Sequence, residues 1–282
     1  MATSTRNADY VRAEIGRVRE LADNRPFAVN LTRRPFDNDV FETALEERPA
    51  IVSLALGAPG DLVDRAHAVG CVFVVQVTTV TQAREAAEAG VDVIVAQGGE
   101  GGGFSGSIGT LALVPQVVEA VAPIPVVAAG GITDGRGLAA AIVLGAQGVN
   151  IGTRFLASVE SRIPDSWKQA IVAAESEDAV KVEFAEHLVP PVTEGGWSTI
   201  PRSLRTSFVD EWTARRDEVP EHVDELRQEL AAAFASGGAH EYLPLTGQSA
   251  GAVKDVLPAA EIVRRVVAEA DEVLRASSAV QV

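Results

Sequence analysis

Short apolar runs and amphipathic stretches alternate at a regular interval through the first two-thirds of the chain. The amphipathic stretches begin near Asp or Thr and end at Gly, which is typical of capped helices. Six apolar runs rich in β-branched residues are expected to form buried parallel strands, at residues 27–31, 50–56, 71–77, 91–96, 124–129 and 148–151. Strand followed by helix, repeated in this way, predicts an α/β protein.

The first apolar run decides between the two common α/β architectures. A doubly wound dinucleotide-binding sheet carries G-x-G-x-x-G after its first strand, whereas this run continues Asn30-Leu31-Thr32 without a glycine. The sequence therefore favours a TIM (β/α)8-type barrel, and a chain of 282 residues suits one such barrel. Six runs in place of eight predict a barrel that is two strands short.

The alternation stops after Phe155. Residues 158–196 have a mixed helical and irregular pattern, and residues 202–237 have a long charged helical periodicity. We therefore expect three parts: barrel strands and helices with the ligand site over residues 1–157, a helical excursion or cap over 158–240, and a closing loop with the last barrel helix over 241–282. In that last helix, over residues 257–276, we expect an apolar stripe to face the core: Ile262, Val263, Val266, Val267, Ala270 and Val273.

Three glycine-rich turns each follow an apolar run. They read AQGGEGGGFSG over residues 96–106, AAGGI over 128–132 and NIGTRF over 150–155. Backbone amides approach an anionic oxygen only where side chains are absent, and glycine removes them. Because the strand ends of a barrel share one face, these turns predict a phosphate-binding site there.

Polar residues at the same strand ends predict what carries the phosphate. Asn30, Gln76 and Gln97 are carboxamides, which both donate to and accept from the polar edge of a flavin without adding charge. Each of them alone is as well explained by a structural role in a turn. Together with the pairs Gly130-Gly131 and Gly152-Thr153, they predict FMN as the cofactor.

Composition and charge exclude several other classes of protein. The formal net charge of −15 argues against a nucleic-acid partner, which needs a basic surface. The single cysteine, Cys71, predicts a buried thiol and a reducing cytoplasm, and the polar opening residues give no signal peptide or membrane span. No His, Cys or acidic grouping has metal-ligand spacing, and the sequence around Ser105 lacks the last glycine of a serine nucleophile elbow.

The sequence resembles the FMN-dependent nitronate monooxygenases, with which flavin enoyl reductases share a fold. The matching pieces are RPFAVNL, AQGGEGGG, PVVAAGGI, GAQGVNIGTRFLAS, PRSLRTSFVDEW and TGQSAGAVKDVLPAAEIV. The resemblance implies that FMN is contacted by Asn30, Gln97, Gly102, Gly130, Gly131, Asn150, Ile151, Gly152 and Thr153, with Gln76 a weaker member. It also implies that alkyl nitronates are oxidised with dioxygen. The implied partners are therefore small molecules, and a homo-oligomer is compatible with the sequence.

The chain departs from this family at two places. The family's glycine loop usually ends in a histidine that serves as the catalytic base, and Phe104 stands in that position here. A phenyl ring accepts no proton, so we expect nitronates to be oxidised and neutral nitroalkanes to react very slowly or not at all. The family also opens with an apolar strand, a helix and a second strand, whereas this chain opens with a helix over residues 9–22, so the resemblance implies a barrel that lacks its first two strands. Either the natural product starts upstream of Met1, which we expect, or the barrel is incomplete.

Two further hypotheses stay open at this point. The first is a flavin-dependent reductase of enoyl thioesters that takes electrons from a nicotinamide, and the second is a non-catalytic barrel that binds flavin. Glu100 is expected to be an exposed carboxylate or to accept backbone amides. The histidines are expected to be structural or at the surface, although His187 in the excursion is a candidate for the site: His67, His187, His222 and His240.

Overall fold

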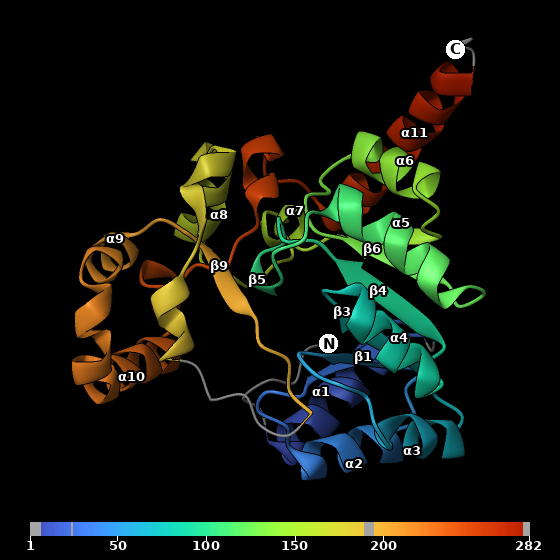
Figure 1. The fold of residues 1–282 in the computed structure, drawn as a ribbon, viewed down its shortest axis with the longest axis horizontal. Coiled ribbons are helices and arrows are strands. Elements are labelled where there is room, and N and C mark those ends of the chain that lie inside the picture. The colour runs from blue at the N-terminus through green and yellow to red at the C-terminus, as the bar shows by residue number, and fades with distance from the viewer. Residues whose placement is uncertain (1–6, 24, 189–194, 279–282) are drawn as a thin grey trace. The chain divides into compact units, whose positions relative to one another are not determined.

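The computed structural model describes residues 7–23, 25–188 and 195–278 (Figure 1). Pro190 and Pro191, expected in irregular chain, lie outside these residues. The chain forms two compact units. Unit 1 comprises Met1–Ala96, Gln116–Val126 and Val192–Ser198, and unit 2 comprises Gln97–Pro115, Val127–Pro191 and Thr199–Val282. The partition of the chain at residues 157 and 240 stays a prediction.

Unit 1 is built on parallel strands that pair in chain order. The strands are β1 (Ala28–Thr32), β2 (Ile51–Ala55), β3 (Val72–Val77) and β4 (Val93–Gln97), whose last residue opens unit 2. The helices are α1 (Ala8–Leu21), α2 (Asn38–Glu46), α3 (Leu62–Ala68) and α4 (Val80–Glu88). Val29, Val52, Phe73 and Ile94 are fully buried, and the registers place them on one face of the sheet. Four predicted strands are thus confirmed.

Unit 2 holds the other two predicted strands. Strands β6 (Val126–Ala129) and β7 (Gly148–Asn150) are parallel, and their register aligns Ala129 with Asn150. Helix α5 (Thr110–Val121) precedes β6 and begins in unit 2. Helix α6 (Gly135–Val143) starts after β6 at Asp134, whose carboxylate accepts the Arg136 and Gly137 amides. The short helix α7 (Thr153–Leu156) follows β7 directly.

The last helix, α11 (Ala259–Ser278), packs against α6, as Figure 1 shows. Ile262, Val266 and Ala270 are buried at 2%, 7% and 3% exposure. The predicted stripe was wrong for Val263 and Val267, which are 51% and 57% exposed. The buried residues recur at spacings of four, so the core contact is a narrower stripe than the sequence suggested.

A small antiparallel sheet in unit 2 was not predicted. It consists of β5 (Gly103–Ser105), β9 (Ile200–Leu204) and β8 (Ala179–Lys181), in that order. The first residues of the stretch predicted to be helical therefore lie in a strand. The helices of that stretch, α9 (Ser207–Ala214) and α10 (Val219–Ser236), begin only after Thr206, whose hydroxyl caps α9 by accepting the Val209 amide.

The helical excursion is confirmed in unit 2. Besides α9 and α10 it contains α8 (Asp165–Ala173) and the 3-10 turns Ser176–Asp178, Glu183–Glu186, Arg216–Glu218 and Ala239–Glu241. It has its own apolar core, in which Phe184, Phe208, Trp212 and Leu226 are buried together. A further 3-10 turn, Gln248–Ala252, leads toward α11. Among the described residues, no helix is long and apolar enough to cross a membrane.

Candidate functional site

The glycine loop after β4 uses its own amides to hold its shape. The Gly98 N–H donates to the Ala129 carbonyl at 2.8 Å, and the Gly99 N–H donates to the Ile108 carbonyl at 2.7 Å. The Gly101 N–H closes a turn on the Gly98 carbonyl at 3.0 Å. These three amides therefore already donate hydrogen bonds within the protein. They hold the loop rigid and are not free to bind a ligand.

Glycines of this loop lie where two other loops press against it. A Cβ on Gly102 would collide with the backbone nitrogen of Gly247, and a Cβ on Gly247 would lie 2.8 Å from the Gly102 nitrogen. Gly130 has a φ of +93°, and a Cβ there would lie 2.9 Å from the Gly98 carbonyl oxygen. At these positions glycine is required for close contact between backbones. Whether Gly102 and Gly130 also contact FMN stays a prediction.

Glu100 ties the glycine loop to the start of α5. Its two carboxylate oxygens lie 3.0 and 2.9 Å from the Thr110 nitrogen, and one of them is 2.9 Å from the Thr110 hydroxyl. Its carbonyl accepts the Gln248 N–H at 2.9 Å. The expectation that Glu100 accepts a backbone amide is confirmed, so this carboxylate has a structural task at a helix N-terminus.

The turns after β6 and β7 are open. Within the described residues, the N–H groups of Gly131 and Gly152 donate no hydrogen bond to the protein. No atom lies within 4 Å of where a Cβ on Gly152 would stand, and both glycines are exposed. Because Ala129 is aligned with Asn150, the two turns begin side by side. Two unused amides beside an unfilled space fit the phosphate of a flavin nucleotide.

Thr153 joins the open turns to the packed glycines. Its side chain is buried, with an exposure of 7%, and its hydroxyl accepts the Gly247 N–H at 2.9 Å. The turn that precedes α7 is thereby fixed to the loop that packs on Gly102. The open space is thus bordered by ordered backbone on the Thr153 side.

The predicted carboxamides lie in both units. Asn30 is the third residue of β1 and does not end it, while Gln76 is the last but one of β3. The registers Asn30 with Ser53 and Ser53 with Val74 place Asn30 and Gln76 on the same face of the unit 1 sheet. Eight predicted contacts lie in unit 2: Gln97, Gly102, Gly130, Gly131, Asn150, Ile151, Gly152 and Thr153. Their contacts with a cofactor stay predictions.

Two basic side chains support the glycine loop and were not predicted. Lys181 at the end of β8 donates to the Ser105 carbonyl, the Ser105 hydroxyl and the Ile200 carbonyl, at 2.7, 2.6 and 2.9 Å. Burial, and then repulsion by Arg202, lower the pKa of the Lys181 amine to about 8. The only signal in the sequence was a lysine between apolar residues in a chain that has just three lysines.

Arg202 holds the other end of the same loop. Its guanidinium donates to the Gly99 carbonyl from two nitrogens, at 2.9 and 3.2 Å, and to the Ala179 carbonyl at 2.6 Å. Burial lowers the pKa of Arg202 below its ordinary value, and the charge of Glu100 opposes this shift. The residue lay in a stretch predicted to be helical, so its contact with the loop was not visible in the sequence.

No histidine takes the place of the family base at residue 104. Phe104 lies in β5 opposite Pro201 and is half-buried. His187, the one histidine considered for the site, lies 3.9 Å from the Glu186 carboxylate in the excursion. His67 and His222 are paired with Asp92 and Glu225. Within the described residues, no group of three or more His, Cys, Asp or Glu is placed to hold a metal ion.

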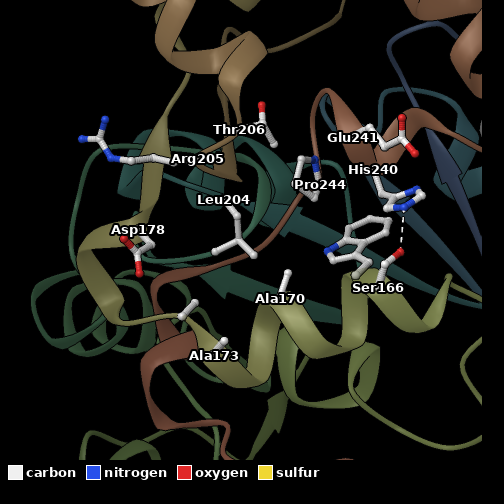
Figure 2. A pocket seen from close by; sticks show the side chains of 12 residues that line it. Ser166, Ala170, Ala173, Asp178, Leu204, Arg205, Thr206, His240, Glu241 and Pro244 are labelled. Carbon is white, nitrogen blue, oxygen red and sulfur yellow. Dashed lines mark hydrogen bonds between the residues drawn. The ribbon is translucent and has the colours of Figure 1, made fainter.

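A separate pocket of about 470 Å³ lies in the helical part of unit 2. Leu204 and Pro244 line its walls (Figure 2). The His240 ring is hydrogen-bonded to Ser166, with 2.9 Å between the imidazole Nε2 and the hydroxyl oxygen. The Trp167 ring stacks on His240 at 6.3 Å between centroids. None of the predicted flavin contacts lines this pocket, so it is distinct from the site at the glycine turns.

Known proteins resemble this chain both in sequence and in structure. The sequence model of the nitronate monooxygenase family matches residues 33–269. Rv1533 of Mycobacterium tuberculosis, which carries a provisional name as a monooxygenase, is 38% identical over 82% of the chain and 57% of its own length. The chain spans about half to two-thirds of the length of the first curated relatives it matches.

Two solved structures are similar over nearly the whole chain. FabK from Thermotoga maritima has a TM-score of 0.87 at 32% identity, with 98% of this chain and 85% of that chain covered. A nitroalkane oxidase from Streptomyces ansochromogenes has a TM-score of 0.83 at 28% identity, with 99% and 89% covered. These similarities confirm the predicted α/β fold of the TIM-barrel type.

Proposed function

Because the chain belongs to the nitronate monooxygenase family, we propose that it is an FMN-dependent oxidoreductase that oxidises alkyl nitronates with dioxygen. The likeness to a nitroalkane oxidase supports flavin-dependent oxidation of a nitrogen-bearing substrate. The observation that carries the proposal is the pair of open turns after β6 and β7, where the amides of Gly131 and Gly152 have no acceptor within the described protein.

These turns would hold the phosphate end of the cofactor. The amides of Gly131 and Gly152 would donate to phosphate oxygens, and the fixed hydroxyl of Thr153 would keep the second turn in place. Gln97 and Asn150, at the ends of β4 and β7, are the carboxamides of unit 2 suited to the polar edge of the flavin ring. When bound, FMN supplies a two-electron acceptor that dioxygen can reoxidise.

The residues of the chain limit which substrates it oxidises. Removing a carbon-bound proton from a neutral nitroalkane needs a base in reach, and Phe104 supplies none. Glu100 accepts hydrogen bonds from the Thr110 N–H and hydroxyl at the start of α5, and such bonds weaken a carboxylate as a base. A nitronate has already lost that proton. The chain is therefore proposed to take nitronates in preference to neutral nitroalkanes.

A second candidate function is reduction of an enoyl thioester with electrons from a nicotinamide. The likeness to FabK supports it, as does a relative from Mycobacterium tuberculosis named as a carboxyl-CoA dehydrogenase and 33% identical over 62% of the chain. The two functions differ in which molecule reduces the flavin, so one anaerobic experiment separates them.

The experiment mixes the FMN-loaded protein anaerobically with ethyl nitronate, nitroethane, NADH or NADPH and follows the visible flavin band. The proposal expects rapid bleaching by ethyl nitronate, slow or no bleaching by nitroethane, and recovery of the band when air is admitted. Rapid bleaching by NADH or NADPH alone would instead support the reductase. Bleaching by none of the four would favour a non-catalytic flavin-binding barrel.

A further inference from the structure

Lys181 and Arg202 form a cationic pair behind the glycine loop. Within the described residues, both side chains form hydrogen bonds to neutral groups alone: Lys181 to Ser105 and Ile200, and Arg202 to the carbonyls of Gly99 and Ala179. Lys181 is half-buried and Arg202 is 8% exposed. Two positive charges in this position carry a cost of desolvation that carbonyl bonds offset only in part.

The carboxylates near this cationic pair do not cancel its positive charge. Within the described residues, neither cation forms an ion pair. Glu100 is the acid whose charge acts on Arg202, and its oxygens are held by Thr110. With the cationic pair it leaves a net charge of about +1 at the loop, in a chain whose formal net charge is −15.

The acidic residues next to β8 in the sequence interact with groups other than Lys181 and Arg202. The Asp178 carboxylate accepts the Glu175 N–H at 2.8 Å, and Glu183 pairs with Arg216 at 3.2 Å. Neither contributes to the shift of the Lys181 pKa, to which burial and Arg202 are the contributors. The groups that set the charge behind the loop are therefore Lys181, Arg202 and Glu100.

The position of Lys181 shows how it acts on the site. Its amine lies 2.6 Å from the Ser105 hydroxyl, which donates to the Gly101 carbonyl at 3.0 Å. Successive side chains of a strand point to opposite faces, so Ser105 and Lys181 lie on the reverse side of β5 from Phe104. Lys181 therefore contacts the glycine loop from the side of β5 opposite Phe104, through Ser105.

We propose that Lys181, together with Arg202, makes this site selective for anionic substrates, with Lys181 as a positioning and specificity-determining residue. The inference rests on the proposed function and deepens it, because a nitronate carries the negative charge that a neutral nitroalkane lacks. For two charges on the order of 10 Å apart at an effective dielectric constant of about 20, the attraction of one positive charge favours an anion by roughly tenfold.

Lys181→Met and Lys181→Arg test this inference with FMN-loaded protein. The matched control is Lys254→Met, because Lys254 is exposed and pairs with the Glu175 carboxylate at 3.3 Å. We expect Lys181→Met to lower kcat/KM for ethyl nitronate about tenfold, mainly through KM, and Lys181→Arg to keep it within about threefold. Lys254→Met should match the wild type, and FMN content should be equal in all four proteins.

The pH profile separates charge from packing. In the wild type, kcat/KM for ethyl nitronate should fall as the pH rises through about 8, where Lys181 loses its proton. This fall with pH should be absent from both variants. Lys181→Met should keep a low kcat/KM throughout because it carries no charge, whereas Lys181→Arg should keep a high kcat/KM because arginine stays charged. Equal kcat/KM in Lys181→Met and wild type, or equal losses in the Met and Arg variants, would overturn the inference.

A second measurement needs no flavin and no turnover. The chain has three lysines, so protein labelled with ¹³C-lysine gives three side-chain signals, and the signal missing from Lys181→Arg is that of Lys181. Sodium nitrate is the probe, because it is a planar anion like the nitronate group. Nitrate should raise the pKa of Lys181 and leave that of Lys254 unchanged, whereas neutral nitroethane should change neither.

The outcomes distinguish the inference from the function on which it rests. If nitrate shifts the pKa of Lys181 but the protein oxidises no nitronate, the anion site is supported and the proposed function is wrong. Nitronate turnover that Lys181→Met leaves unchanged would remove the inference alone. If Lys181→Met does not fold, the nitrate titration of the wild type and the Lys181→Arg profile still decide, and a Lys181 pKa indifferent to nitrate contradicts the inference.

Discussion

Glycines have different structural roles in two regions of unit 2, the packed glycine loop and the open turns after β6 and β7. At Gly98, Gly102 and Gly247 the space of a side chain is filled by neighbouring backbone or by Thr110, so glycine permits loops to touch. At Gly152 that space is empty, and the amides of Gly131 and Gly152 have no acceptor in the described protein. The difference shows that a glycine-rich sequence marks both the scaffold of a site and the site itself. Only the surroundings of each glycine tell them apart.

The largest effect is expected in the packed region, from Gly102→Ala. The new methyl group would collide with the Gly247 nitrogen, so backbone would have to shift to accommodate it. We expect a loss of about 3 kcal/mol in the free energy of unfolding, measured by urea denaturation. A loss below about 0.5 kcal/mol would mean that this contact is not tight and would erase the contrast between the regions.

A smaller effect is expected at Thr153, which links the two regions. Thr153→Val keeps the shape of the side chain and removes the acceptor of the Gly247 N–H. We expect the free energy of unfolding to fall by about 1 to 2 kcal/mol, since a buried donor is left without a partner. Thr153→Ser is the matched control and should keep most of the stability in the same denaturation experiment. A Thr153→Val variant as stable as the wild type would contradict this role of the hydroxyl.

The cationic pair predicts a pH dependence of stability. The pKa of Lys181 is about 8 in the folded protein, against an ordinary value of 10.5. Between these values the unfolded chain binds more protons, so the free energy of unfolding should rise with pH over this window relative to Lys181→Met. Below pH 8 the difference between the two proteins should be constant. Thermal unfolding from pH 7 to 10.5 measures it, and a difference that falls with pH would contradict the assigned shift.

The smallest effect on stability is expected in the open region. Gly152→Ala and Gly148→Ala both place a methyl group where no atom lies within 4 Å, and neither glycine has a positive φ. Both variants should unfold within about 0.5 kcal/mol of the wild type. A loss of more than about 1 kcal/mol for Gly152→Ala alone would show that this turn is packed after all.

The parallel strands were predictable because each is a continuous apolar run closed by a turn. Residues 91–96, for example, correspond to β4, and the Asp134 cap and the glycine after it mark the start of α6. Such signals are local in the sequence and need no knowledge of the remaining chain. The open turns after β6 and β7 were found in the same way, as glycines at strand ends.

The support of the glycine loop was not predictable, because its contacts join residues far apart in the chain. Lys181 and Ser105 are 76 residues apart, and Arg202 and Gly99 are 103 residues apart. The sheet that brings them together uses strands of three to five residues, one of which contains Pro201. A strand that is short or contains proline shows no recognisable alternation of apolar and polar residues.

The central claim, that the turns after β6 and β7 hold a phosphate, is tested most directly by titrating FMN and riboflavin into wild type, Gly152→Val and Gly148→Val. We expect wild type and Gly148→Val to bind FMN at least about tenfold more tightly than riboflavin, as the loss of charge-assisted bonds to a phosphate implies. Gly152→Val should remove this preference while the protein stays folded. A Gly152→Val variant that keeps the full preference for FMN, or a wild type that binds both flavins equally, would contradict the account.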